Sequence, residues 1–398
     1  MIIPDSLEDI QKWVSSRIRM KKSFKICGKG TRFVDSISLE SKLIPSDILS
    51  LQKLKGKRFF DPEDMVVCLE SGMSVRKMNQ ILGKRNMFLP VNPWFSDSCV
   101  GSVVACNDLG PNRMNMGGLR DCILGIEYVN GKGEIVKAGG KVVKNVSGYD
   151  ITRMLLGSQG GFGVITAVTF KLTPLPEKPF GMYGIFENEA WLSKVKELHE
   201  YRIPLDWVQG ASTSDSKWIL GLGYSGNLLK RTRIENEIKK IFGEKLVILP
   251  DGELFSGQNF TPGENRYNGF LKSFSDIWKL DRFHFHLFAT LTTENTLSFP
   301  IDFFLKEDLK ILIHPIGGDI HFLHKSTNSN DQLKLLEKIK SILVDSDSKL
   351  RWVSGAPKNS LNDLGEFAIT SSFPLIKRLK NHLDPVGVFS APYYDLGI

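Results

Sequence analysis

The stretch from residue 144 to residue 165 reads KNVSGYDITRMLLGSQGGFGVI and determines how the rest of the chain is interpreted. It closes the most glycine-rich part of the sequence, since 14 of the 63 residues from Gly101 to Gly163 are glycine. Strand-like runs lie between these glycines, unlike the fixed repeat of collagen or the polar composition of a linker. Because glycine has no Cβ, its backbone can pass close to a bound molecule. The pattern therefore predicts main chain that contacts a flat or phosphorylated ligand, with a purely structural glycine-rich barrel as the alternative.

The sequence around this stretch predicts an N-terminal α+β domain. Strands are expected at 23–27, 65–69, 123–129, 134–138 and 164–172, and helices at 7–18 and directly after Ser74, an N-cap residue. The turn Asn130-Gly131-Lys132-Gly133 indicates a hairpin. Prolines 174, 176 and 179 then mark the predicted domain boundary.

After residue 179 the pattern predicts a second α+β unit, with one antiparallel sheet covered by helices. Its strands are expected at 182–186, 217–222, 245–249, 283–291 and 319–323, and its helices at 189–200, 228–242 and 331–344. A last helix is expected at 373–383.

The composition is that of a globular protein and excludes several classes. The chain has 398 residues, of which 41% are hydrophobic and 24% charged, and a formal net charge of +8. The longest basic run, residues 17–22, is short, so no nucleic-acid partner is expected. No apolar run approaches the roughly 18 residues of a transmembrane segment, and no signal peptide is expected. Five cysteines without a C-x-x-C pair argue against a disulfide framework, a zinc knuckle or an iron–sulfur cluster in this chain, and favour the cytoplasm.

Six short motifs follow one another in the first half of the chain. They are Gly-x-Gly-Thr at 28–31, Phe-Asp-Pro-Glu-Asp at 60–64, Gly-Ser-Val-Val-Ala at 101–105, Arg-Asp at 120–121, Lys-Asn-Val-Ser-Gly-Tyr-Asp at 144–150 and Gly-x-x-Gly-Val-Ile-Thr at 160–166. In this order they resemble flavoproteins with a p-cresol methylhydroxylase (PCMH)-type FAD-binding domain, in particular the FAD-binding subunits of bacterial glycolate oxidases. The resemblance implies an α+β fold, in which a two-subdomain PCMH-type FAD-binding domain precedes an α+β cap domain with an antiparallel sheet.

The resemblance and the proline cluster together predict three segments. An FAD-binding domain is expected at 1–178 and a substrate or cap domain at 179–372. A C-terminal helix and tail at 373–398, which contain the family signature Asp384-Pro385-x-Gly387-Val388-Phe389, are expected to return toward the FAD-binding domain.

The resemblance also implies which residues contact FAD. The loop after the first strand would hold the pyrophosphate, for which inward-turned N–H groups of small residues are suited. Relatives that attach flavin through histidine need one in this domain, and the first histidine here is His199, so noncovalent FAD is expected. A thioether to Cys99 or Cys106 is the alternative. The implied FAD-binding residues are Gly28, Lys29, Gly30, Thr31, Arg32, Pro93, Gly101, Ser102, Ala105, Arg120, Asp121, Asn145, Gly148, Tyr149, Asp150, Gly163, Val164 and Ile165.

Oxidation of a 2-hydroxy acid requires a base for the hydroxyl proton and a cation for the carboxylate. The predicted catalytic residues are His284, His286, His321 and Arg282, and Arg266 and Arg351 are further candidates for the cation. His314 and His321 are seven residues apart, which resembles the His-x-Gly-Asp-Gly-Asn-x-His metal motif of flavin-dependent D-2-hydroxy acid dehydrogenases. They are the predicted ligands of a divalent metal, with hydrogen-bonded sheet histidines as the alternative.

These features predict an FAD-dependent oxidoreductase subunit that oxidises a small 2-hydroxy acid, such as glycolate or D-lactate, by hydride transfer to flavin. Electrons are expected to leave through an iron–sulfur partner subunit, alongside a second flavoprotein subunit. The expected location is the cytoplasm, with attachment to the inner face of the membrane only through partners. The alternative is a non-catalytic FAD-binding subunit that relays electrons or supports a catalytic partner.

Overall fold

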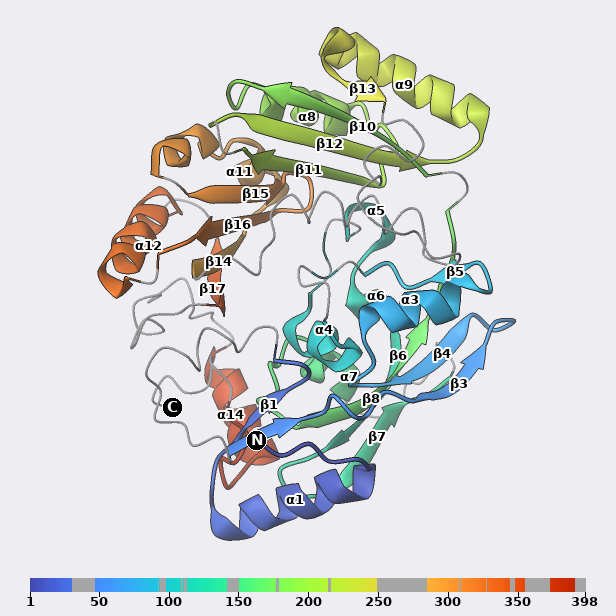
Figure 1. The fold of residues 1–398 in the computed structure, drawn as a ribbon, viewed down its shortest axis with the longest axis vertical. Coiled ribbons are helices and arrows are strands. Elements are labelled where there is room, and N and C mark those ends of the chain that lie inside the picture. The colour runs from blue at the N-terminus through green and yellow to red at the C-terminus, as the bar shows by residue number, and fades with distance from the viewer. Residues whose placement is uncertain are drawn as a thin grey trace.

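The computed structural model shows two layered parts, an N-terminal part (1–176) and a C-terminal part (179–354), with a last segment (373–390) beside the first (Figure 1). The structure describes residues 1–30, 47–91, 93, 98–108, 110, 113–141, 150–176, 179–213, 216–248, 285–307, 309–326, 328–343, 348–354 and 373–390. Within these residues, no helix combines the length and the apolar character needed to cross a membrane.

The described residues of the N-terminal part form three sheets. The strands β1 (Lys25–Cys27) and β2 (Ile48–Ser50) pair in parallel, and α1 (Leu7–Met20) precedes them. The largest of the three is antiparallel, in the order β3 (Lys57–Asp61), β4 (Val66–Glu70), β8 (Val164–Lys171), β6 (Ile123–Val129) and β7 (Ile135–Gly139). The helices are α3 (Val75–Gly83), α4 (Val100–Cys106), α5 (Arg113–Met116), α6 (Leu119–Cys122) and α7 (Ile151–Leu155), and β5 (Met87–Phe88) pairs with β9 (Thr173–Pro174).

Local signals explain two of these elements. Ser74 caps α3 as predicted, because its side chain accepts a hydrogen bond of 3.2 Å from the Lys77 N–H. The predicted hairpin joins β6 and β7. Its turn is held by Asn130 Oδ1, which accepts the N–H groups of Lys132 and Glu134 at 2.9 Å each.

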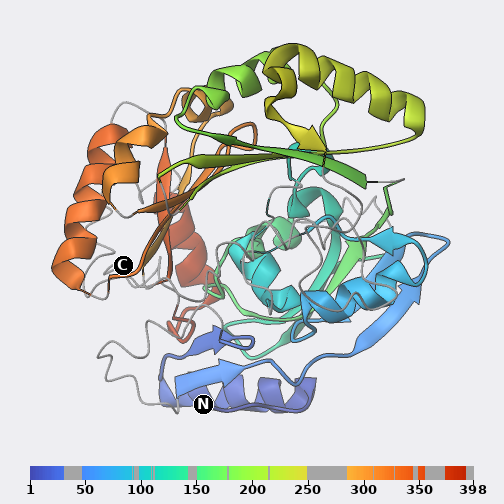
Figure 2. The same ribbon diagram turned by 45° about the horizontal axis from the view of Figure 1, so that its top comes forward.

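The C-terminal part is one eight-stranded antiparallel sheet whose outer face is covered by helices (Figure 2). The strand order is β13 (Val247–Ile248), β10 (Pro179–Phe186), β12 (Trp218–Ser225), β11 (Trp207–Ser212), β15 (Lys310–His314), β16 (Asp319–His324), β14 (Phe285–Thr290) and β17 (Lys349–Ser354). The helices are α8 (Trp191–Glu200), α9 (Leu228–Phe242), α11 (Thr293–Leu297) and α12 (Ser329–Leu343), with 3₁₀ helices η2 (Gly243–Lys245) and η5 (Ile301–Glu307). A core rich in aromatic side chains, including Trp191 and Trp218, lies between the sheet and these helices.

The predicted fold class is confirmed, and the helices at 228–242 and 373–383 have the predicted bounds. The predictions missed α4 and the strands β11, β15 and β17. All six residues of β11 are buried, so the strand shows no alternation of apolar and polar residues to detect. The predicted boundaries after residues 178 and 372 fall at stretches outside the described residues and stay predictions.

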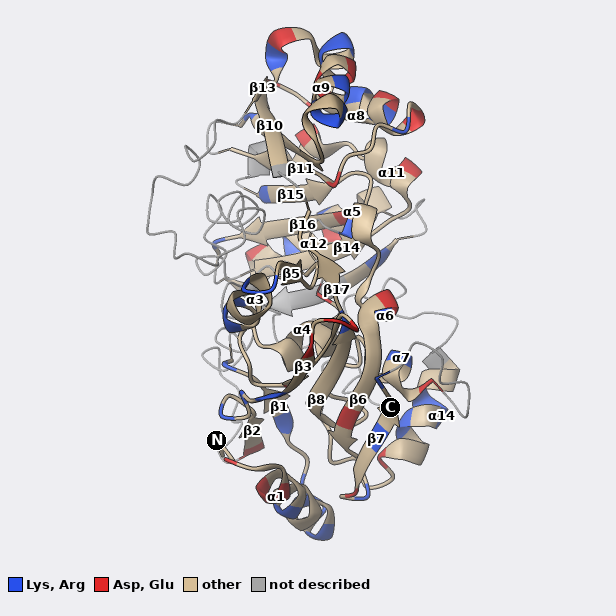
Figure 3. Cartoon of the chain, turned by 90° about the vertical axis from the view of Figure 1, so that its right-hand side faces the viewer, with Lys and Arg blue, Asp and Glu red and all other residues tan. Residues whose placement is uncertain are grey.

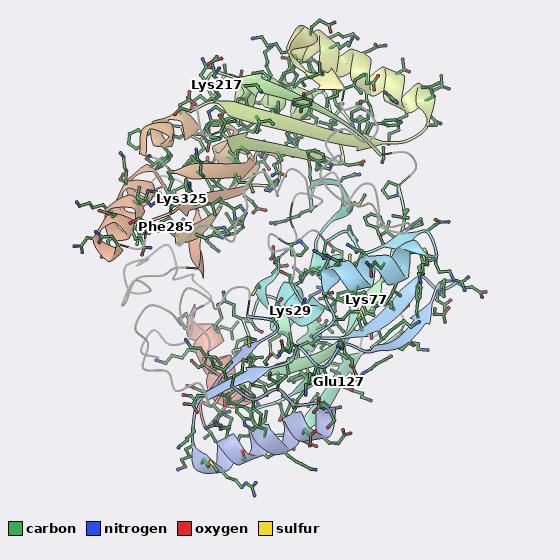
Figure 4. All side chains as sticks on the ribbon, viewed as in Figure 1. Lys29, Lys77, Glu127, Lys217, Phe285 and Lys325 are labelled. Carbon is green, nitrogen blue, oxygen red and sulfur yellow. The ribbon has the colours of Figure 1, made fainter. Side chains whose placement is uncertain are left out.

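Charged side chains lie mainly on the outer helices, and Glu127 in β6 is an exception (Figures 3 and 4). Its side chain is buried and pairs with Arg58 Nη1 at 2.8 Å, while Thr166 Oγ1 donates a hydrogen bond of 2.8 Å. Burial raises the pKa of Glu127, but the contacts with Arg58 and Thr166 outweigh it, so the pKa lies below its ordinary value. The ionised pair therefore stabilises the fold at neutral pH.

Replacing Arg58 by methionine is expected to lower the free energy of unfolding by about 2 kcal/mol at pH 7, because Glu127 is then a buried charge that has lost its arginine. Lys137, 3.6 Å from Glu127, limits the loss. Because the paired carboxylate stabilises the native chain only while it is ionised, the difference between parent and variant should shrink as the pH falls below the ordinary pKa of glutamate. Urea unfolding at several pH values measures it. A difference that stays constant with pH contradicts this account.

Candidate functional site

The first glycine loop lies against the start of α4. Residues 28–30 follow β1, and Lys29, in the middle of the loop, lies beside α4 (Figure 4). A Cβ added to Gly28 would lie 2.9 Å from Cys99 Sγ, the residue before α4. A Cβ added to Gly101 would lie 2.6 Å from the Cβ of Ser71, which follows β4. Backbone from three segments is therefore too closely packed here for larger side chains.

A third glycine segment, residues 157–163, is tied to the same helix. The Gly157 N–H donates to the carbonyl of Val104 at 3.0 Å, and the Gln159 N–H donates to that of Ala105 at 2.7 Å. Gly160 has a φ of +84° and lies against Ile26 of β1, to which an added Cβ would come within 3.2 Å. We call residues 28–30, 101–105 and 157–163 the glycine cradle.

The glycine cradle fits an elongated, phosphorylated cofactor. Its segments come from distant parts of the sequence and meet at α4, where the glycines pack directly against the side chains of Cys99, Ser71 and Ile26. FAD presents a flat ring system and a dianionic pyrophosphate, both of which can be approached closely by such backbone. The hydroxyl group of Ser102 points back to its own helix, because Oγ donates to the Cys99 carbonyl at 2.8 Å.

Three other predicted FAD-binding residues occupy helix starts near the cradle. Asp121 Oδ2 accepts the Gly118 N–H at 2.9 Å and caps α6, where Arg120 is exposed. Asp150 caps α7, because its Oδ1 accepts the Arg153 N–H at 3.1 Å, and it also accepts a hydrogen bond from the Thr152 hydroxyl at 2.5 Å. Burial raises the pKa of Asp150, but hydrogen bonds from Thr152 and the backbone, together with the charges of Arg153 and Arg120, lower it overall. Both carboxylates thus fix local backbone.

Of the remaining predicted FAD-binding residues, some belong to the described part of the chain and the others lie outside it. Gly163, with a φ of +156°, directly precedes β8, which begins with Val164 and Ile165, and a Cβ added to Gly163 would lie 2.7 Å from Tyr128 Cδ2. Pro93 is buried. Thr31, Arg32, Asn145, Gly148 and Tyr149 lie outside the described residues.

The inner face of the eight-stranded sheet carries a cluster of buried histidines. Phe285 and Leu287 pack into the helix-covered core, so His286, between them on β14, points to the other face. His286 Nε2 lies 2.7 Å from Nδ1 of His321 on β16, and His314 of β15 has its ring centre 6.4 Å from that of His321. We call these three residues, each at most 3% exposed, the histidine cluster.

The geometry of the histidine cluster suits proton transfer. Two ring nitrogens 2.7 Å apart share one proton, so the His286–His321 pair can accept a further proton as a unit. Burial lowers the pKa of His314 to about 3, so this imidazole is neutral at physiological pH. The ring of Phe288 packs edge-on against His321 and helps to shield the His286–His321 pair from water.

The helix α5 connects the two parts of the molecule at this face (Figure 1). Arg113 Nη1 lies 3.6 Å from Oδ1 of Asp319, the residue that pairs with His314 across β15 and β16. Asn115 Nδ2 donates to Oδ1 of buried Asp206 at 2.8 Å. A guanidinium group from the N-terminal part thus lies next to Asp319, the strand neighbour of His314.

The predicted catalytic residues are therefore only partly placed. His286, His321 and the predicted metal ligand His314 come together, whereas His284, Arg282 and Arg266 lie outside the described residues. Arg351 belongs to β17. In the described part of the chain, no three His, Cys, Asp or Glu residues are grouped so as to hold a metal ion, and the metal site stays a prediction.

Arg113 was missed by the sequence interpretation. The only local signal is a cation inside the glycine-rich stretch, four residues before Gly117. Its position beside Asp319 depends on how α5 packs against a sheet that begins more than 60 residues later, which no spacing rule indicates.

Comparison with known proteins agrees with this geometry. Residues 1–139 match the model of the family described as FAD binding domain. Residues 1–139 are therefore an FAD-binding domain of the PCMH type, with FAD as its cofactor, and the predicted resemblance is confirmed over these residues.

Curated relatives match over similar lengths. Glycolate oxidase subunit GlcE of Escherichia coli (strain K12) is 30% identical over 148 residues, which are 37% of this chain and 42% of that protein. Glycolate oxidase subunit GlcD of Bacillus subtilis (strain 168) is 32% identical over 129 residues, 32% of this chain and 27% of that protein. D-lactate dehydrogenase of Anaerostipes hadrus is 29% identical over 178 residues, 44% of this chain and 38% of that protein. The chain thus matches less than half the length of each of these relatives.

Solved structures show the same architecture along nearly the whole chain. Two crystal forms of alkyldihydroxyacetonephosphate synthase superimpose with TM-scores of 0.64 and 0.65, covering 98% of this chain and 76% of the other. The sequences are 13% identical, so this likeness shows the fold alone.

Proposed function

We propose that this chain is a subunit of an FAD-dependent dehydrogenase and oxidises a small 2-hydroxy acid such as glycolate or D-lactate. The observation that carries the proposal is the hydrogen-bonded His286–His321 pair on the sheet face that looks toward the FAD-binding domain. Relatives named as glycolate oxidase subunits and D-lactate dehydrogenase support this substrate class.

The proposed chemistry needs three groups, and this chain supplies two. Oxidation removes a proton from the hydroxyl group and a hydride from the carbon that bears it. FAD, when bound, supplies the hydride acceptor. The His286–His321 pair would accept the hydroxyl proton, since histidine is the side chain that most often acts as a general base. Arg113 would bind the substrate carboxylate, because a guanidinium group can donate two parallel hydrogen bonds to it.

We infer that FAD is held noncovalently and that electrons leave through partner subunits, one of which carries iron–sulfur clusters. The five cysteines of this chain contain no C-x-x-C pair, so clusters would have to come from elsewhere. The names of two relatives describe them as subunits, which supports an assembly that includes a second flavoprotein. Such partners would also hold the assembly at the inner face of the membrane.

A relay subunit without its own substrate is the second candidate. It is favoured by the sequence around His314 and His321, which lacks the asparagine and the glycine positions of the metal motif it resembles. In that case the histidine cluster would be structural and FAD would only pass electrons.

Anaerobic reduction separates the two candidates. The full chain is purified with FAD, and its visible absorbance is followed after addition of glycolate or D-lactate. We expect bleaching by one of these acids. A yellow protein that neither acid bleaches, but that is reduced once a partner flavoprotein and its substrate are added, would establish the relay instead.

A further inference from the structure

Lys380 in α14 (Phe373–Leu383) joins three segments of the chain through one ammonium group. Its Nζ donates to Asp384 Oδ2 at 2.7 Å, to the carbonyl of Gly161 at 2.7 Å and to that of Phe389 at 2.6 Å. An ammonium group has three N–H donors, so these acceptors match its capacity. The Lys380 side chain is 14% exposed and that of Asp384 is fully buried.

Asp384 in turn fixes the tail that follows α14. Its two carboxylate oxygens accept the N–H groups of Val388 and Phe389, both at 2.9 Å. Hydrogen bonds to a buried charged group are strong, so they fix the position of the backbone that takes part in them. Lys380 is therefore rigidly placed when it meets Gly161, a residue of the glycine cradle.

The same tail also holds the strand that leads to the other cradle loop. The Phe24 N–H donates to the Val388 carbonyl at 2.8 Å, and the Ser390 N–H donates to the Phe24 carbonyl at 3.0 Å. The rings of Phe24 and Phe389 meet edge to face, 5.5 Å apart. Phe24 directly precedes β1, whose Ile26 contacts Gly160.

We propose that residues 380–390 form a clamp that sets the affinity for FAD, with Lys380 as its positioning residue. The clamp fixes the 157–163 loop and β1 in their bound positions before FAD binds. Less conformational entropy is therefore lost when FAD binds. This proposal rests on the FAD-binding domain and not on hydroxy-acid oxidation, so its test needs no substrate.

The test measures the dissociation constant of FAD for the full chain by quenching of flavin fluorescence. Lys380→Met is expected to raise it by roughly tenfold or more, because the loop must then be ordered on binding. Lys380→Arg keeps the charge and should recover most of the affinity. Lys377→Met, at an exposed lysine on the same helix, is the matched control and should leave the constant unchanged. An unchanged dissociation constant in Lys380→Met overturns the proposal.

A second variant separates the clamp from simple loss of stability. Lys380→Met leaves the buried Asp384 carboxylate without this ion pair, whereas Lys380→Met/Asp384→Asn removes both charges. The melting temperature of each FAD-free chain is recorded beside its FAD affinity. A double variant that melts like the parent but binds FAD weakly supports the clamp. If affinity returns together with the melting temperature, the network is only structural and the clamp is wrong.

Discussion

Replacing His321 by asparagine is expected to slow reduction of the bound flavin by glycolate or D-lactate about 10²–10⁴-fold, the usual contribution of a general base. The FAD dissociation constant should change far less than this rate, because the glycine cradle, which is expected to hold the pyrophosphate, lies in the N-terminal part and is not altered. Anaerobic stopped-flow absorbance measures the rate, and flavin fluorescence measures the affinity.

Two further variants show whether His321 acts with His286. Since the two rings share one proton, His286→Asn should slow the same step, and the double variant should be hardly slower than the slower single variant. His324→Asn is the matched control on the same strand, where Nδ1 accepts the Ser326 N–H. A His321→Asn chain reduced as fast as the parent contradicts the proposed catalytic role.

Replacing Gly101 by alanine is expected to weaken FAD binding roughly 10- to 100-fold. The new Cβ would lie 2.6 Å from the Ser71 Cβ, and relief requires α4 to shift away from the end of β4. Overpacking of this kind costs about 1–3 kcal/mol. In the FAD-free chain α4 can shift to relieve the contact, whereas bound FAD would prevent that shift. The strain therefore raises the dissociation constant of FAD.

A double-mutant cycle tests the stated cause. Ser71→Gly removes the atom that the new methyl group meets, and the combination with Gly101→Ala should recover most of the FAD affinity. Ser71→Gly alone reports the effect of losing its 2.6 Å hydrogen bond to the Ile165 carbonyl. If the two changes are simply additive, the contact between these positions is not what disturbs the cradle.

The positions of the cradle glycines could be predicted from sequence, because the backbone at each position requires glycine, whereas their contacts with FAD stay predictions. Gly160 and Gly163 adopt positive φ values, and Gly28 and Gly101 meet other chain segments closely. Such a requirement can be read from the sequence, because it selects glycine at that position. Helices with strong apolar periodicity, such as α9, were predicted because that pattern too is carried by the local sequence.

The histidine cluster could be predicted only in part, because it depends on pairing between strands. His314 and His321 come together across the turn between β15 and β16, which their spacing reflects. His286 and His321 are 35 residues apart in the sequence. Their contact depends on the register in which β14 pairs with β16. Arg113 depends on the docking of α5, for which the sequence carries no periodic signal.

The central claim is that FAD lies between the glycine cradle and the histidine cluster, and the electron density of the full chain crystallised with FAD tests it most directly. We expect the pyrophosphate beside residues 28–30 and the ring system between α4 and the eight-stranded sheet. Density for FAD at another surface, or full-length crystals soaked with FAD that show none at the cradle, would contradict the account.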